Sequence, residues 1–122
     1  MLALGGSLGG QRLFSRQLVG CVTRNYTGDR LNELVLDYAP EIANFGLGVR
    51  VRGELPDMLP CGSLAGPRTF LHGAGLNGVA WSDPDTGVSF AFLNNAYVPR
   101  VPRRWITGQM DRMSNIVHSA VE

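Results

Sequence analysis

The chain has 122 residues, of which 44% are hydrophobic and 17% are charged, and its formal net charge is +1. This length suits one domain or part of one, and the composition indicates a globular protein rather than a disordered one. Its apolar runs are too short to cross a bilayer, and its N-terminus does not resemble a signal peptide. Its location therefore stays open, with the cytoplasm as the default. The 11 basic residues are scattered along the chain, which argues against nucleic-acid binding.

The two cysteines, Cys21 and Cys61, lie far apart, and no further cysteine or histidine stands at metal-ligand spacing from either. We therefore expect no metal and no cofactor. The cysteines are predicted to be buried free thiols, although they could pair in an oxidising compartment. All 11 basic residues are arginine. Chemistry that needs a lysine is thus excluded within this chain.

A short helix is predicted over residues 16–24, because Ser15 is a suitable N-cap and apolar residues recur on one helical face. Leu18, Val19 and Val22 form that face. Residues 1–4 are typical of the end of a helix, and four glycines then predict a turn: Gly5, Gly6, Gly9 and Gly10. Residues 25–45 show no clear period and are predicted to be mostly loop.

Strand periodicity begins at Gly46. In residues 46–53 Val49 and Val51 alternate with Arg50 and Arg52, which predicts a strand with one solvent-exposed face. A proline-containing loop follows, and then a short strand over 68–72. Segments 79–82 and 88–93 are predicted to form a hairpin around the turn at 83–87, because Pro84 and Gly87 suit such a turn. Trp81, Phe90 and Phe92 can share one face of this hairpin.

A final amphipathic helix is predicted over residues 104–121. Its apolar side would consist of Ile106, Met110, Met113, Val117 and Val121. The order of elements predicts an α+β fold, in which an antiparallel sheet of about three strands packs with this C-terminal helix.

Several motifs in order resemble the C-terminal part of the serine β-lactamase, penicillin-binding protein and class C-like esterase superfamily. The resemblance rests on GGQRLFSRQLV (9–19), FGLGVRV (45–51) and FLHGAGLNGVAWSDPDTGVSFAFLNN (70–95), followed by the final helix. It covers essentially the whole chain but about a third of a complete family member. It implies that residues 1–122 form a single partial domain of the β-lactamase-like transpeptidase fold.

The resembled family uses three motifs for acyl transfer. Ser-x-x-Lys supplies the nucleophile and its base, Tyr-x-Asn supplies a second acid or base, and a Lys/His-Thr-Gly strand forms the opposite wall of the cleft. The first cannot occur without lysine. The second is absent, because Tyr26, Tyr38 and Tyr97 are followed two residues later by Gly28, Pro40 and Pro99. Only the third has a counterpart, in residues 72–74.

The resemblance implies a role for each residue of this counterpart. His72 would point into the cleft and either polarise the catalytic network or hold an anionic group of the substrate. Gly73 would allow close approach of the acyl group, and the Gly75 backbone N–H would be one donor of the oxyanion hole. Ala74 would also line the substrate site, although it departs from the glycine that the family prefers there. We expect His72 on the sheet edge, facing open space.

Several candidates have simpler interpretations. His72 could be an ordinary half-exposed strand histidine. Ser7 lies in GGSLG, which fits the G-x-S-x-G nucleophile elbow, but it lacks the preceding strand and following helix that the elbow needs and is predicted to be a turn residue. Asp83, Asp85 and Thr86 are expected to form a hairpin turn rather than a cation loop. His118 is expected on the surface rather than beside His72.

These observations predict the C-terminal part of a β-lactamase-related serine hydrolase that is inactive alone. Its full-length parent would take an ester or amide small-molecule substrate. The alternative is a small non-catalytic binding or interaction domain. Because strand edges would be left open, we expect marginal stability and self-association of the isolated chain.

Overall fold

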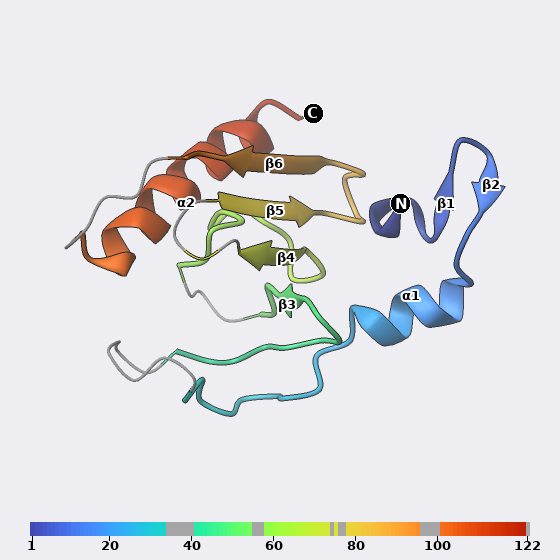
Figure 1. Cartoon of the computed structure of the whole chain (residues 1–122), viewed down its shortest axis with the longest axis horizontal. Helices are drawn as coiled ribbons and strands as arrows, with labels where there is room; N and C mark the ends of the chain where they lie inside the picture. The colour runs from blue at the N-terminus through green and yellow to red at the C-terminus, as the bar shows by residue number, and fades with distance from the viewer. Residues whose placement is uncertain (34–40, 55–57, 74, 76–77, 96–100, 122) are drawn as a thin grey trace.

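The computed structural model describes residues 1–33, 41–54, 58–73, 75, 78–95 and 101–121. Its centre is an antiparallel sheet in the order β3-β4-β5-β6, with one long helix, α2, against one face (Figure 1). The strands are β3 (Arg50–Val51), β4 (Phe70–Gly73), β5 (Gly78–Ser82) and β6 (Ser89–Leu93), and α2 spans Arg103–Ser119. The predicted α+β class is confirmed, with four strands in this sheet rather than about three.

Strand register separates a face of the sheet that α2 covers from a second face that is open around His72, although Val51 and Phe70 on that second face are buried. Leu71 lies opposite Trp81, which lies opposite Phe90, so these side chains project toward α2. The neighbouring His72, Ala80 and Ala91 are also in register and project from the other face. All three are exposed, as are most side chains of β6. The predicted sharing of one face by Trp81, Phe90 and Phe92 is thus confirmed, since Phe92 lies opposite Val79.

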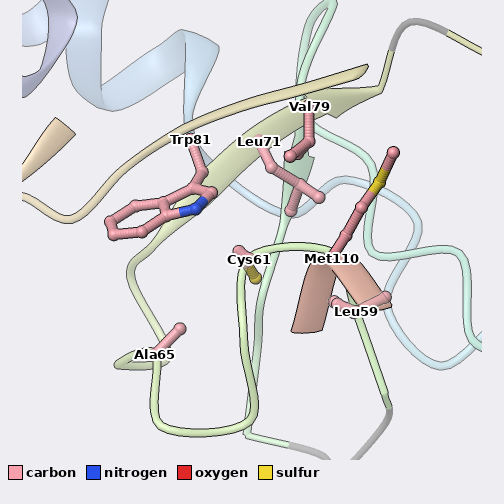
Figure 2. Close-up of a cluster of buried hydrophobic side chains, with 7 residues drawn as sticks. All are labelled: Leu59, Cys61, Ala65, Leu71, Val79, Trp81 and Met110. Carbon is pink, nitrogen blue, oxygen red and sulfur yellow. The ribbon is translucent and has the colours of Figure 1, made fainter. Parts of the chain in front are cut away.

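The hydrophobic core lies between the covered face and α2, and a loop over residues 58–66 contributes to it (Figure 2). Its members are Leu59, Cys61, Ala65, Leu71, Val79, Trp81 and Met110. The loop is held in place by polar contacts: the Ser114 hydroxyl donates to the Pro60 carbonyl at 2.7 Å, and the Leu64 N–H donates to Asn115 Oδ1 at 2.9 Å. These bonds tie two backbone groups of the loop to side chains of α2.

The two elements with the clearest local signals agree with their predictions. In the β5–β6 hairpin the Gly87 N–H donates to the Asp83 carbonyl at 2.9 Å, and Gly87 has φ +74°, the left-handed conformation that the turn needs. In α2, Met110 is buried, while Ile106, Met113 and Val117 pack partly buried against the core. The helix ends at Ser119, however, so Val121 lies beyond it and is 39% exposed.

The N-terminal segment forms a small unit at the end of the sheet that carries the β5–β6 turn (Figure 1). Helix α1 (Arg16–Val22) begins as predicted, because Ser15 Oγ accepts a hydrogen bond from the Leu18 N–H at 3.1 Å. Before it, a 3-10 helix (Leu2–Leu4) precedes a two-stranded hairpin of β1 (Ser7–Leu8) and β2 (Gln11–Arg12). The expected glycine turn is therefore part of a hairpin.

The predicted strand over 46–53 is wrong in length and in its exposed face. Only Arg50 and Val51 form β3, and Arg52 is as buried as Val51, at 6% exposed each. Arg50 lies opposite Leu71, on the covered side of the sheet. There its Nη1 donates a hydrogen bond to Glu41 Oε1 at 3.1 Å, and its Nη2 donates to the Ile42 carbonyl oxygen at 2.5 Å. The residues still alternate between the two faces, but the face that carries Arg50 is the covered one, where Glu41 provides a charged partner. Residues 25–33 and 41–45 lie outside helices and strands, as predicted, while 34–40 lie outside the described residues.

Gly46 marks the point where the chain after α1 is tightly packed. A Cβ built at Gly46 would lie 2.4 Å from the Val22 carbonyl oxygen. Gly46→Ala is therefore expected to push α1 and the 46–49 turn apart and to cost about 1–3 kcal/mol of stability, measured by urea unfolding.

Gly20→Ala is the matched control for Gly46→Ala. A Cβ at Gly20 meets no atom within 4 Å, and the position lies inside α1. Because alanine favours helix over glycine by up to about 1 kcal/mol, this variant should be neutral or stabilised. Equal urea midpoints for the two variants would contradict the packing argument.

Among the described residues, no helix is both long and apolar enough to cross a membrane.

Candidate functional site

His72 lies in β4 near the strand's C-terminal end, on the open face of the sheet. It pairs with Ala80 of the antiparallel β5, and its side chain is exposed. The ring contacts the chain through Nδ1, which lies 3.2 Å from the Gly48 carbonyl oxygen. The expected placement is confirmed: His72 faces open space and is not packed among Trp81, Phe90 and Phe92.

The edge of β4 is only partly covered by β3. The two strands pair at Arg50–Leu71 and Val51–Phe70, and the pairing goes no further. Within the described residues, His72 and Gly73 therefore have a strand partner on the β5 side alone. An open strand edge can pair with the backbone of an extended ligand.

The two described glycines of the motif leave free space around this edge. A Cβ built at Gly73 or at Gly75 meets no atom of the described part of the chain within 4 Å, and both residues are exposed. Gly75 has φ +58°, a conformation that glycine adopts at little cost. Ala74, the third motif residue, lies outside the described residues.

His72 stands between two hollows. One, of about 500 Å³, lies beside the β4 edge and reaches the N-terminal part of α2; His72, Gly73 and Gly75 line it together with Glu41, Arg50 and Thr107. The other, of about 350 Å³, lies over the open sheet face and is lined by His72 with Phe70, Ala80 and Ala91. The first hollow therefore combines the motif residues with a charged pair.

That charged pair, Arg50 with Glu41, was not identified from the sequence as part of a site. The Arg50 side chain is 13% exposed and that of Glu41 is 33% exposed. Arg50 Nε is buried and has no hydrogen-bond partner among the described residues. The sequence contained no local signal for this pair, because Arg50 fits the polar phase of a strand and Glu41 lies in a stretch without periodicity.

The remaining candidates fall into structural roles. Ser7 is in β1, in a short hairpin rather than a nucleophile elbow. Asp83 Oδ1 accepts from the Asp85 N–H at 2.9 Å, and Asp85 pairs with Arg68 at 2.7 Å, as expected of a hairpin turn. Within the ranges that the structure describes, no cluster of three His, Cys, Asp or Glu side chains could hold a metal ion.

His118 corrects an expectation, because it is partly buried rather than a surface residue. Its ring stacks on Trp81 with centroids 4.3 Å apart, and its Nε2 lies 2.9 Å from the Cys61 carbonyl oxygen. The α2 helix brings it against the covered sheet face, whereas His72 lies on the open face. His118 is thus not a partner of His72, as expected.

Both cysteines are free thiols, with Cys61 buried and Cys21 half-buried. Burial raises the pKa of the Cys61 thiol from 9.0 to about 12, even though the nearby Arg52 acts in the opposite direction. Because the folded-state pKa is the higher one, this thiol contributes stability that is complete below pH 9 and is lost as the pH rises through about 12.

We therefore expect the wild-type chain to lose more stability than Cys61→Ala between about pH 8 and pH 10.5. The difference between the two losses should be on the order of a few kcal/mol at most. The measurement is the urea midpoint at both pH values. Leu64→Ala, at a 62% exposed position of the same loop, is the control and should behave as wild type. If Cys61→Ala lost as much stability at alkaline pH as the wild-type chain, the loss would have to come from other groups.

This chain is similar to a known protein in structure but matches none in sequence. No family model matches the chain, and no curated protein matches it in sequence. The structure is similar to the crystal structure of a β-lactamase from Mycobacterium bovis, with a TM-score of 0.69 and 21% sequence identity. The fold is β-lactamase-like. The similarity covers 88% of this chain and 38% of that β-lactamase, so the chain spans well under half of that protein's length.

Proposed function

We propose that the chain is the C-terminal part of a β-lactamase-related serine hydrolase of the esterase or β-lactamase type. In this proposal it contributes one wall of an acyl-transfer site, whose substrate in the full-length parent is a small ester or amide. The observation that carries the proposal is the placement of His72 at an open strand edge, followed by two exposed glycines, beside a hollow of about 500 Å³. The β-lactamase-like fold supports the same assignment.

Each motif residue has a role in the proposed wall. His72 faces the reacting groups, Gly73 leaves room for the acyl group, and the Gly75 N–H is one donor to the developing oxyanion. Ala74 is included as a further substrate contact. The nucleophile and its base would come from the part of the parent outside residues 1–122, because this chain has no lysine for Ser-x-x-Lys.

The proposal is tested by reading the coding DNA on the 5′ side of the Met1 codon and expressing whatever is in frame with it. An in-frame Ser-x-x-Lys would give a joined protein that hydrolyses a nitrophenyl ester or a chromogenic β-lactam. In that protein His72→Ala should lower kcat/KM roughly 100-fold or more, because a positioned acid–base group commonly contributes that much. Arg112→Ala, on the exposed side of α2, is the control and should be close to wild type.

A stop codon and ribosome-binding site immediately before Met1 would instead favour the small non-catalytic binding domain. An NMR titration of the isotope-labelled chain then distinguishes the two functions further. Titration with an intact ester or β-lactam should shift the backbone amides of His72, Gly73 and Gly75 if the wall binds acyl compounds. Shifts confined to other parts of the chain would contradict the proposed site.

We also expect the isolated chain to self-associate. In the described part of the sheet, β6 pairs with β5 alone, and Leu93 at its end is 76% exposed. An open strand edge invites pairing with another chain. Sedimentation velocity over a dilution series should show dimers or larger species at high concentration. A monomer throughout, with a cooperative melt above about 60 °C, would indicate a complete, independently stable domain.

A further inference from the structure

The contact between His72 and Gly48 determines which ring nitrogen of His72 carries a hydrogen. Nδ1 lies 3.2 Å from the Gly48 carbonyl oxygen. A carbonyl oxygen can only accept, so Nδ1 must be the donor. In a neutral imidazole one nitrogen donates and the other accepts. Nε2, the outer nitrogen, is then left with a lone pair.

Gly48 is held so that its carbonyl can make this contact. Its φ is +78°, which glycine adopts readily and other residues rarely do. The turn around it is fixed on both sides: the Gly46 N–H donates to the Val49 carbonyl at 2.8 Å, and the Leu47 N–H donates to the Val22 carbonyl at 2.9 Å. The Gly48 carbonyl is thus part of a bonded turn rather than of a free loop.

We propose that Gly48 is a positioning residue that holds His72 in the Nδ1–H tautomer, so that the neutral ring presents a hydrogen-bond acceptor at Nε2. The inference rests on the proposed function. It distinguishes the two roles suggested for His72, which are to polarise the catalytic network or to hold an anionic group of the substrate. A neutral acceptor takes a hydroxyl or an N–H donor, from the nucleophile or from the leaving group of an ester or amide. In this neutral form the ring has no second N–H with which to hold a carboxylate of the substrate, whereas the imidazolium would have one.

His118 provides an internal reference for this assignment. Its Nε2 lies 2.9 Å from the Cys61 carbonyl oxygen, so by the same reasoning Nε2 carries the hydrogen and Nδ1 is the acceptor. The chain contains two histidines in total. The structure therefore predicts opposite tautomers for the two rings of one molecule.

The test is a long-range ¹H–¹⁵N correlation spectrum of the ¹⁵N-labelled full chain, recorded at the alkaline end of a pH series, where the ring ¹⁵N signals no longer change with pH. His72→Asn and His118→Asn assign the two rings. We expect His72 as Nδ1–H and His118 as Nε2–H. His72 observed as Nε2–H, or as an average of both forms, would overturn the proposal.

Gly48→Ala tests the positioning role, because a side chain at φ +78° is strained and should displace the carbonyl. His72 should then shift toward the Nε2–H form while His118 stays unchanged. Gly87→Ala is the matched control: its φ is +74°, its Cβ also meets no atom within 4 Å, and it lies in the distant β5–β6 turn. An unchanged His72 signal in Gly48→Ala would remove Gly48 from the proposal.

Sodium acetate then serves as an anionic probe at the same pH. The ring nitrogens of His72 should not shift with it, whereas a saturable shift would assign the residue to anion binding and overturn the inference. These readouts are independent of catalysis. If the tautomer of His72 is the other one, the proposed hydrolase function is still tested by the activity of the joined protein. If the joined protein is inactive, the tautomer assignment is unaffected.

Discussion

Trp81→Ala is expected to destabilise the chain by roughly 3–5 kcal/mol, a large part of the stability of any small domain. Trp81 is 2% exposed at the centre of the core. Its ring contacts the His118 ring at 4.3 Å and the Phe90 ring at 5.7 Å, measured between centroids. Its removal would leave a cavity between β5 and α2 that this packing cannot close.

Trp81 also supports the loop over residues 58–66. Its Nε1 donates to Ser114 Oγ at 2.9 Å, and the same hydroxyl donates to the Pro60 carbonyl at 2.7 Å. Losing the indole therefore leaves a buried hydroxyl short of one donor, in addition to the lost packing.

Trp105→Ala is the matched control for Trp81→Ala. Trp105 lies in the first turns of α2 and is 59% exposed. Its truncation should change stability by about 0.5 kcal/mol or less. Urea unfolding of both variants measures the difference. A Trp81→Ala midpoint close to that of Trp105→Ala would show that α2 and the sheet do not share one core.

The isolated chain is expected to hydrolyse neither a chromogenic β-lactam nor a nitrophenyl ester above the buffer rate. Acyl transfer in serine hydrolases depends on an activated nucleophile, and without it only the weak effects of binding and oxyanion stabilisation remain. In the part of the chain that the structure describes, the hydrogen-bonded serine hydroxyls contact backbone groups, one another, Trp81 or Asn115. None of them bonds to an imidazole or a carboxylate.

Mass spectrometry after incubation with a labelled fluorophosphonate or penicillin provides the measurement. We expect the unmodified mass. Stoichiometric acylation would contradict this prediction, and the modified serine would then identify a nucleophile that the motif analysis excludes. Ser7→Ala should be included, since Ser7 lies in the elbow-like GGSLG sequence.

Local interactions explain which elements were predictable. The N-cap at Ser15, the turn closed by Gly87 and the apolar face around Met110 depend on residues near one another in the chain, so their signals survive in the sequence. The open-edge position of His72 was predicted from the motif resemblance and is confirmed. By contrast, the alternation over 46–53 placed Arg50 and Arg52 on an exposed face, because strand periodicity does not show which residues the neighbouring strand and loops will cover.

The sequence by itself determined the α+β class, the hairpin, the two main helices and the absence of a Ser-x-x-Lys motif. These depend on local pattern and on composition. Only the tertiary structure decided that Arg50 pairs with Glu41, that His118 stacks on Trp81, and that the Gly48 carbonyl meets His72 across 24 positions of the chain. Each of these contacts joins residues from separate elements, and their pairing depends on how the loops close around the sheet.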